Sequence, residues 1–316
     1  MTSHRHTTLH ILPVFLVVTL VAGISWSEGM SEATLAYNSG NYSEAVRQFQ
    51  LGAENGDARA QYGLGVMYEH GRGVPQDLKK AFMWYMKAAK QGNAPAENNV
   101  GYLYFTGRGA EQDYTQALFW FSRAVENGEP GKWDSSLAWC NLGNIYYWGH
   151  GTSKNLRKAA DCYRKSAEAG NPFAANNLGC MYERGEGVDR DPAQSVTWYR
   201  KAADQGYPFA ERNLAIMYES GQGVMQDYGE ALKWYSKAAT QGNSFAQYKM
   251  GLIYERGLGV AKDPVESYKW YLLASGKGNQ KAENSAAKLR PGLSTTQVNE
   301  ATRQATVFQT APGIRQ

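Results

Sequence analysis

The chain has 316 residues, of which 43% are hydrophobic and 20% charged, so it has enough apolar side chains for a continuous core and too few charges for a disordered chain. Its 33 Lys and Arg against 29 Asp and Glu give a net charge of +4 with no block of basic residues, which argues against a dedicated nucleic-acid surface. The 21 Tyr and 9 Trp indicate an architecture that uses large aromatic side chains repeatedly.

Residues 1–27 have the layout of a secretory signal peptide. Residues 1–10 carry Arg5 and no acid, residues 11–24 form an apolar run of 14, and a short polar segment follows. The run is short for a membrane span, which needs about 20 residues. We therefore expect a periplasmic or secreted protein with no stable membrane insertion after cleavage; an uncleaved N-terminal anchor is the alternative.

Residues 28–56 predict a degenerate, TPR-like capping repeat. Phe49 matches Tyr85 of the first full repeat, and Asn41 matches Asp77, if the loop between the two helices is five residues shorter. Asn41 also opens a glycosylation sequon, but a role as helix N-cap explains it structurally.

From Asp57 the chain repeats with a period of 36 residues. Ala always occupies the fourth position, Tyr the twelfth, and Asp or Asn the twenty-first, and each repeat closes on Gly. The six repeats, separated once by an insertion at 129–134, cover 57–278: 57–92, 93–128, 135–170, 171–206, 207–242 and 243–278.

Each repeat predicts two short helices joined by a Gly-x-Gly turn, as in Gly71 and Gly73. Apolar residues at positions 4, 8, 11 and 12 mark one face of the first helix. Asp or Asn at position 21 is the expected N-cap of the second helix, which Pro192 and Pro264 support by standing at the first helical position. Gly at position 9, as in Gly65, is expected to let a neighbouring helix approach closely. Helices this short need burial between repeats, so we predict an all-α superhelix of paired helices.

Beyond the last repeat, residues 279–305 predict C-terminal capping helices, with Ser294 as the N-cap of the last one. Residues 306–316 show no pattern and are expected to form a disordered tail.

The run Leu-Gly-x-x-Tyr-x-x-Gly-x-Gly-Val-x-x-Asp, followed by Lys-Ala-x-x-Trp-Tyr-x-Lys-Ala-Ala-x-x-Gly-Asn, is seen best in residues 64–93 and resembles the Sel1-like repeat family. The resemblance covers residues 57–278 and implies a right-handed α-superhelix that serves as an adaptor. Bacterial members of exported type take part in envelope regulation, secretion or host contact. Some cysteine-rich members have been described as β-lactamase-like, but their regular Cys pairs are absent here.

Few residues suggest catalysis or metal binding. His70 and His150 lie at separate turns without a partner at metal-ligand spacing, and we interpret both as exposed loop residues. Ser285 and Lys288 form a Ser-x-x-Lys that lacks the accompanying β-lactamase motifs. We therefore expect no enzyme, no cofactor and no metal. Three cysteines permit at most one internal disulfide, and Cys140 and Cys162 are expected to point in different directions.

Positions 6, 10 and 13 of the first helix lie opposite its apolar face on a helical wheel, so we expect them to project outward. Repeats two and three are unusual there, because four repeats carry Glu at position 13 and these two carry Phe105 and Tyr147. An aromatic patch flanked by Asn side chains is typical of a protein-binding site. The predicted partner-binding residues are Asn99, Tyr102, Phe105, Asn141, Asn144, Tyr147 and Trp148.

Repeat three also has Cys162 where the other repeats have Trp, and it gains Trp133 and Trp139. Two interpretations stay open: these tryptophans belong to the binding patch, or one of them fills the space of the missing Trp.

The sequence thus predicts an exported scaffold that binds another protein or peptide on the concave face of the superhelix, which the first helices line in related solenoids. The alternatives are a cell-envelope glycan or peptidoglycan binder and a hydrolase-like, β-lactamase-related protein. The sequence does not identify the partner or the oligomeric state.

Overall fold

The computed structural model describes residues 31–310 except 130 and 132, and all regular secondary structure in that part is helical. Residues up to Ala174 form one compact unit and residues from Ala175 another, termed the N-terminal and C-terminal halves, and each half is described by itself. The predicted signal peptide lies outside the described residues.

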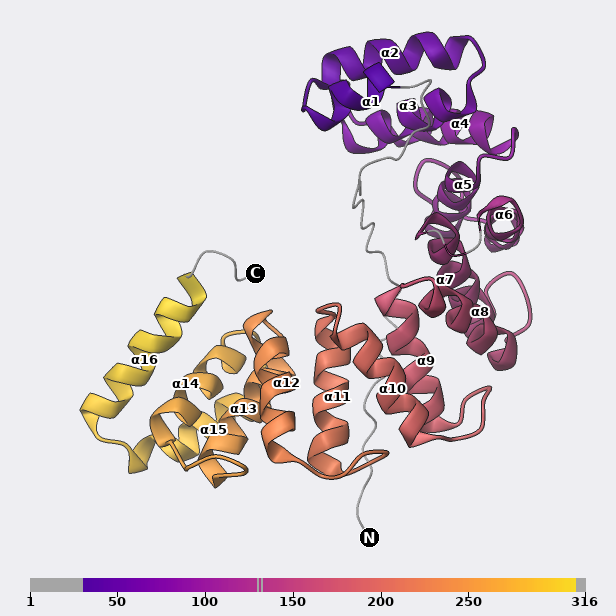
Figure 1. Cartoon of the computed structure of the whole chain (residues 1–316). Helices are drawn as coiled ribbons and strands as arrows, with labels where there is room; N and C mark the ends of the chain where they lie inside the picture. The colour runs from indigo at the N-terminus through magenta and orange to yellow at the C-terminus, as the bar shows by residue number, and fades with distance from the viewer. Residues whose placement is uncertain (1–30, 130, 132, 311–316) are drawn as a thin grey trace. The chain divides into compact units, whose positions relative to one another are not determined.

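The helices of the N-terminal half follow one another in pairs, shown from indigo to magenta in Figure 1. They are α1 (Ser31–Asn38), α2 (Tyr42–Glu54), α3 (Ala58–His70), α4 (Leu78–Ala89), α5 (Ala94–Thr106), α6 (Tyr114–Asn127), α7 (Trp133–Trp148) and α8 (Leu156–Glu168).

The division between the halves falls inside α9 (Pro172–Arg184). The C-terminal half continues with α10 (Pro192–Ala203), α11 (Pro208–Ser220), α12 (Tyr228–Thr240), α13 (Ser244–Arg256), α14 (Pro264–Ser275), α15 (Gln280–Leu289), the 3-10 helix η1 (Arg290–Gly292) and α16 (Thr295–Thr310).

Within repeats, α3 packs on α4, α5 on α6, α7 on α8, α11 on α12 and α13 on α14. The predicted all-α, TPR-like fold of paired helices is confirmed. First helices such as α3 and α5 begin at the second position of their repeats, because Asp57 and Asn93 cap them through hydrogen bonds from Ala60 N and Ala96 N.

The N-cap of the second helix is confirmed in every repeat. Asp77 Oδ1 accepts a hydrogen bond from Lys80 N at 3.0 Å, and Asn155, Asp191 and the other residues at position 21 do the same. Pro192 and Pro264 stand at the start of α10 and α14, where a missing N–H has no consequence.

Two kinds of glycine serve the turn and the close approach of the helices. Gly71 and Gly73 both have positive φ, and a Cβ on Gly73 would lie 2.5 Å from the Tyr42 carbonyl oxygen, at the start of the preceding second helix. A Cβ on Gly65 would lie 2.5 Å from the Tyr85 ring. Glycine at position 9 therefore lets the aromatic residue at position 29 cross its own first helix, as the sequence suggested.

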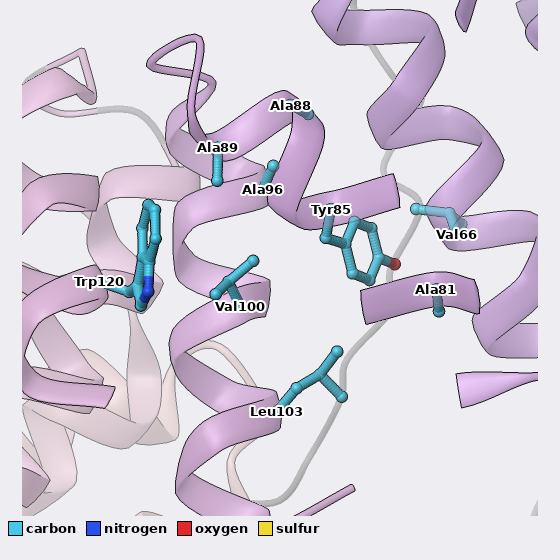
Figure 2. Close-up of a cluster of buried hydrophobic side chains, with 9 residues drawn as sticks. All are labelled: Val66, Ala81, Tyr85, Ala88, Ala89, Ala96, Val100, Leu103 and Trp120. Atoms are coloured by element: carbon cyan, nitrogen blue, oxygen red, sulfur yellow. The ribbon is translucent and has the colours of Figure 1, made fainter. Parts of the chain in front are cut away.

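The Trp at position 28 joins one repeat to the one before it. Figure 2 shows the Trp120 ring of α6 lying with Val100, Ala96 and Ala89, and these residues belong to one buried cluster. The alanines at the ends of the second helices are fully buried, because only a small side chain leaves room for this ring.

Both ends of the array differ from the middle. Asn41 accepts a hydrogen bond from Glu44 N and starts α2, as predicted. Ser294 Oγ accepts one from Gln297 N at 3.2 Å and starts α16. That helix runs through Thr310 instead of ending near 305, because Phe308 packs on the Trp270 ring at a centroid distance of 5.3 Å. The end of the predicted insertion is helical, since α7 begins at Trp133.

Candidate functional site

The predicted outward row of the first helices is largely buried. Asn144 is 9% exposed and Tyr147 is 6% exposed, and Cys140 is buried as well. The prediction that these three side chains project outward is therefore wrong. A helical wheel takes account of one helix only, whereas α5 and α7 also pack against each other and cover much of the face opposite their own second helices.

A buried tyrosine from the second helix meets a glutamate at position 13 of the first helix. The Tyr85 hydroxyl donates to Glu69 at 2.6 Å, and Tyr199 donates to Glu183 at 2.6 Å. The same pairing joins Tyr235 to Glu219 and Tyr271 to Glu255. Burial raises the pKa of these tyrosines, so the hydroxyls stay neutral donors. Glutamate at position 13 thus accepts a hydrogen bond from the core tyrosine of its own repeat, while the exposure of the glutamate itself ranges from buried at Glu69 to exposed at Glu255.

Repeats two and three depart from this pairing for a chemical reason. Repeat two has Phe121 in place of the tyrosine, so there is no hydroxyl to satisfy, and Phe105 packs against the cluster that contains Phe121. In repeat three the Tyr163 hydroxyl donates instead to Asn144 Oδ1 at 2.7 Å, which frees position 13 for Tyr147. The aromatic residues that marked these repeats as unusual are in part consequences of core chemistry.

Phe105 belongs to an aromatic cluster with Tyr114 and His150. Its ring centroid lies 5.2 Å from that of Tyr114 and 5.6 Å from that of His150, and the His150 ring stacks on Tyr114 at 4.5 Å. The interpretation of His150 as an exposed loop residue is therefore wrong, and His70 is likewise only partly exposed. This cluster joins the turn of repeat three to the start of α6.

The asparagines near this face bond to one another along the N-terminal half. Asn141 Nδ2 donates to Asn98 Oδ1 at 2.9 Å, and Asn98 Nδ2 donates to Asn99 Oδ1 at 3.4 Å. Asn99 and Asn141 are partly buried. These amides hold neighbouring repeats in register, which accounts for them without a bound peptide.

Trp139 takes the place of the missing Trp in repeat three. Lysines at position 31 lie over the position-28 Trp elsewhere, as Lys87 does over Trp84 at 3.9 Å. In repeat three the corresponding Lys165 lies 4.0 Å from the centroid of Trp139, which packs against the cluster containing Cys162. The repacking interpretation accounts for Trp139, whereas the side chain of Trp133 lies outside the described residues.

Trp148 is the most exposed side chain of the predicted patch. It is 49% exposed and makes an edge-on contact with the Tyr147 ring at 5.1 Å, while Lys154 lies over Tyr147 at 5.4 Å. Tyr102 and Phe105 are partly exposed, and burial raises the pKa of Tyr102. The buried Tyr147 therefore fixes the orientation of an exposed tryptophan.

The sequence analysis missed two buried glutamates at position 5. Glu97 pairs with Arg123 at 3.0 Å and accepts hydrogen bonds from Asn127. Glu211 accepts one from Gln241 at 2.9 Å, and burial raises its pKa to about 7, which the charge of nearby Lys237 only partly offsets. An acid at a position that borders the apolar face is the signal that could have revealed them.

The three cysteines are free and buried. Burial raises the pKa of Cys140 and Cys162 to about 12 and that of Cys180 to about 11, which disfavours the reactive thiolate. Within the described part of the chain there is no group of three or more His, Cys, Asp or Glu placed to hold a metal ion. None of the helices of residues 31–310 is long and apolar enough to cross a membrane.

Tandem helix pairs, an internal Tyr–Glu column and one exposed aromatic patch define a repeat scaffold of the kind that serves protein–protein interaction. The chain belongs to the Sel1 repeat family, as predicted. The family model matches residues 58–93, 94–129, 136–171, 172–207, 208–243 and 244–279.

Two solved structures of this family are similar to the chain. The c5321 protective antigen of uropathogenic Escherichia coli is 34% identical with a TM-score of 0.75, covering 88% of this chain and 63% of that one. A Sel1 repeat protein from Oxalobacter formigenes is 32% identical with a TM-score of 0.68, covering 78% of this chain and 96% of that one.

A short match falls within a longer protein. DAP3-binding cell death enhancer 1 of Rattus norvegicus is 48% identical over 44 residues, which is 14% of this chain and 9% of that protein. The chain thus spans under two thirds of both the rat protein and the E. coli antigen.

Proposed function

We propose that the protein is an exported, non-enzymatic adaptor that binds a partner protein or peptide at the first-helix face of its N-terminal half. The observation that carries the proposal is Trp148, half exposed yet held in orientation by Tyr147. A preoriented tryptophan loses little side-chain entropy on binding, and tryptophan is enriched among the residues that dominate interface energies.

The other predicted binding residues divide into two groups by their position. Trp148 is the exposed contact residue, and the partly exposed Tyr102 joins it because, unlike Phe105, which is also partly exposed, it is not part of the ring cluster with Tyr114 and His150. The remaining five, namely Asn99, Phe105, Asn141, Asn144 and Tyr147, position the surface from beneath through internal bonds and ring contacts.

The relatives support a binding role in general terms. The rat protein, which matches this chain over 44 residues, is named for binding DAP3. For this chain the partner is proposed only as a polypeptide with an apolar side chain that packs on Trp148.

The scaffold proposal also rests on how the candidate catalytic groups are used. The three thiols are buried, and burial raises their pKa values, which disfavours the nucleophilic thiolate. Packing in the core accounts for these three groups.

The test is a crosslinking pull-down from cell-envelope and secreted fractions with the wild type, with Trp148→Ala/Tyr102→Ala, and with Met225→Ala as a control at a side chain that is 87% exposed in the C-terminal half. The proposal expects a captured protein that the double variant loses and the control keeps, with unchanged helicity in all three. Equal capture by all three chains would refute the site. Capture of an oligosaccharide and no protein would favour the glycan-binding alternative.

A further inference from the structure

A second unusual surface lies on the second helices of repeats one and two. Position 27 projects from these helices, and it holds Met83 in α4 and Phe119 in α6, which are 45% and 49% exposed. In the four later repeats the same position is polar or charged, with Asp161, Thr197, Lys233 and Lys269. The apolar pair is therefore peculiar to this part of the chain and is not required by the repeat.

The helix that carries Met83 is strongly basic. Between Leu78 and Lys90 there are four lysines and no acid, and all four side chains are exposed. Lys79, Met83, Lys87 and Lys90 follow one another at intervals of four, four and three residues, which places them along one stripe of the helix. Lys80 forms an ion pair with the N-cap Asp77 at 3.8 Å, whereas α4 itself carries no acid near Lys79, Lys87 or Lys90.

The core links α6, which carries Phe119, to the end of α4. The neighbouring Trp120 belongs to the same buried cluster as Ala88 and Ala89 of α4, as Figure 2 shows. Phe119 itself stays on the outer side, with its ring edge-on to Trp120 at 5.2 Å. Met83 thus stands among the lysines of α4, and Phe119 adds a second exposed apolar side chain on α6, whose charged residues are Arg123 and Glu126.

We propose that this face of α4 and α6 binds the surface of an anionic lipid bilayer, peripherally and without insertion of a helix. Lysines attract anionic headgroups, and exposed Phe and Met side chains enter the boundary between headgroups and acyl chains. The positive charge of the α4 lysines is what favours an anionic lipid surface as the binding partner. A lipid surface also receives protruding side chains without a matching pocket, whereas an acidic protein would need one for Met83 and another for Phe119.

This surface is independent of the proposed partner site, which lies on the first helices. A membrane-attached adaptor would leave the Trp148 side chain available, because Trp148 ends α7 and is not part of α4 or α6. Failure of either proposal therefore leaves the other untouched.

The experiment places an environment-sensitive fluorophore at Met83→Cys in the full chain, with Thr197→Cys as the matched control at the same repeat position in repeat four. The three native thiols are buried, so labelling goes to the introduced cysteine. The probe is vesicles of phosphatidylethanolamine and phosphatidylglycerol at three to one (about 25% anionic lipid), against vesicles of phosphatidylcholine alone.

We expect a blue shift at position 83 with anionic vesicles only, none at position 197, and loss of the shift as salt rises. Lys79→Gln/Lys87→Gln/Lys90→Gln in the labelled background should weaken binding by roughly a hundredfold, at about fivefold for each lysine. No shift at position 83, equal shifts at both positions, or a shift that survives the triple change would overturn the proposal. A shift with poly-glutamate and none with vesicles would also overturn it, and would assign the face to an acidic protein.

Discussion

The Tyr85 hydroxyl donates a 2.6 Å hydrogen bond to the carboxylate of Glu69, sixteen residues earlier in the same repeat. The bond crosses from the second helix to the first above Gly65, whose missing side chain makes room for the ring. The same arrangement recurs wherever a repeat has Tyr at position 29 and Glu at position 13, so glutamates that seemed free on the surface are each bonded to a buried tyrosine.

The first prediction concerns Phe105 and Phe121, which stand in repeat two at the positions of the Glu and Tyr that pair in other repeats. Phe121→Tyr alone buries a hydroxyl without its usual acceptor and should lower the unfolding free energy by about 1–3 kcal/mol. Adding Phe105→Glu supplies the acceptor, so the double variant should lose less than the sum of the single variants by about 1 kcal/mol or more. Urea unfolding of the four chains measures the coupling, and strictly additive effects would refute the internal role of position 13.

The second prediction concerns the relocated tryptophan of repeat three. Trp139→Gln alone should lower the unfolding free energy by about 3–5 kcal/mol through a cavity, and Cys162→Trp alone should cost about 1–3 kcal/mol through overpacking. The double variant has residues that other repeats carry at both positions. It should therefore lose less unfolding free energy than either single variant. Thermal melts of the single and double variants decide the point, and a double variant worse than both singles would contradict it.

The third prediction is a pH dependence that Glu211 causes. Its pKa is raised from 4.5 to about 7 in the folded chain, so between these values the folded state holds a proton that the unfolded state has released. Stability should therefore fall as pH rises from about 4.5 to 7, by on the order of 2–3 kcal/mol in total.

Glu211→Gln should remove this dependence because an amide does not titrate. The quantity to compare is the difference in urea midpoint between pH 5 and pH 8 for the wild type and the variant, which cancels the effects of other groups. Equal differences in the two chains would show that Glu211 titrates at its ordinary pKa.

The fourth prediction is that the cysteines are unreactive in the folded protein. Their pKa values of about 11 to 12 leave little thiolate at pH 8, and all three are buried. Ellman's reagent should modify none of them quickly under native conditions and all of them in urea. A rapidly reacting thiol in the native protein would show that one of these sites opens to solvent.

Much of the fold was predictable because every repeat carries the same residue types at the positions that cap, end and pack its helices. Asp77 and its equivalents cap a helix, Gly71 ends one, and the small residue at position 9 marks a close contact. Repetition turned each of these weak signals into a strong one.

The candidate site was harder to predict because burial there comes from other helices. The periodicity of α7 alone could not reveal that Asn144 and Tyr147 are covered by neighbours. One clue was present in the sequence: Glu at position 13 accompanies Tyr at position 29, and Phe105 accompanies Phe121. Trp148 was predicted as part of the patch, and its support by Tyr147 required the side-chain geometry.

The most direct test of the adaptor proposal is site-specific photocrosslinking in living cells, with a benzophenone amino acid at position 148 and, as the control, at position 225. We predict a crosslinked adduct with one defined polypeptide from position 148 and none from position 225. Adducts of equal intensity from both positions, or none from position 148 while the chain is folded and exported, would contradict a partner site at the first-helix face of the N-terminal half.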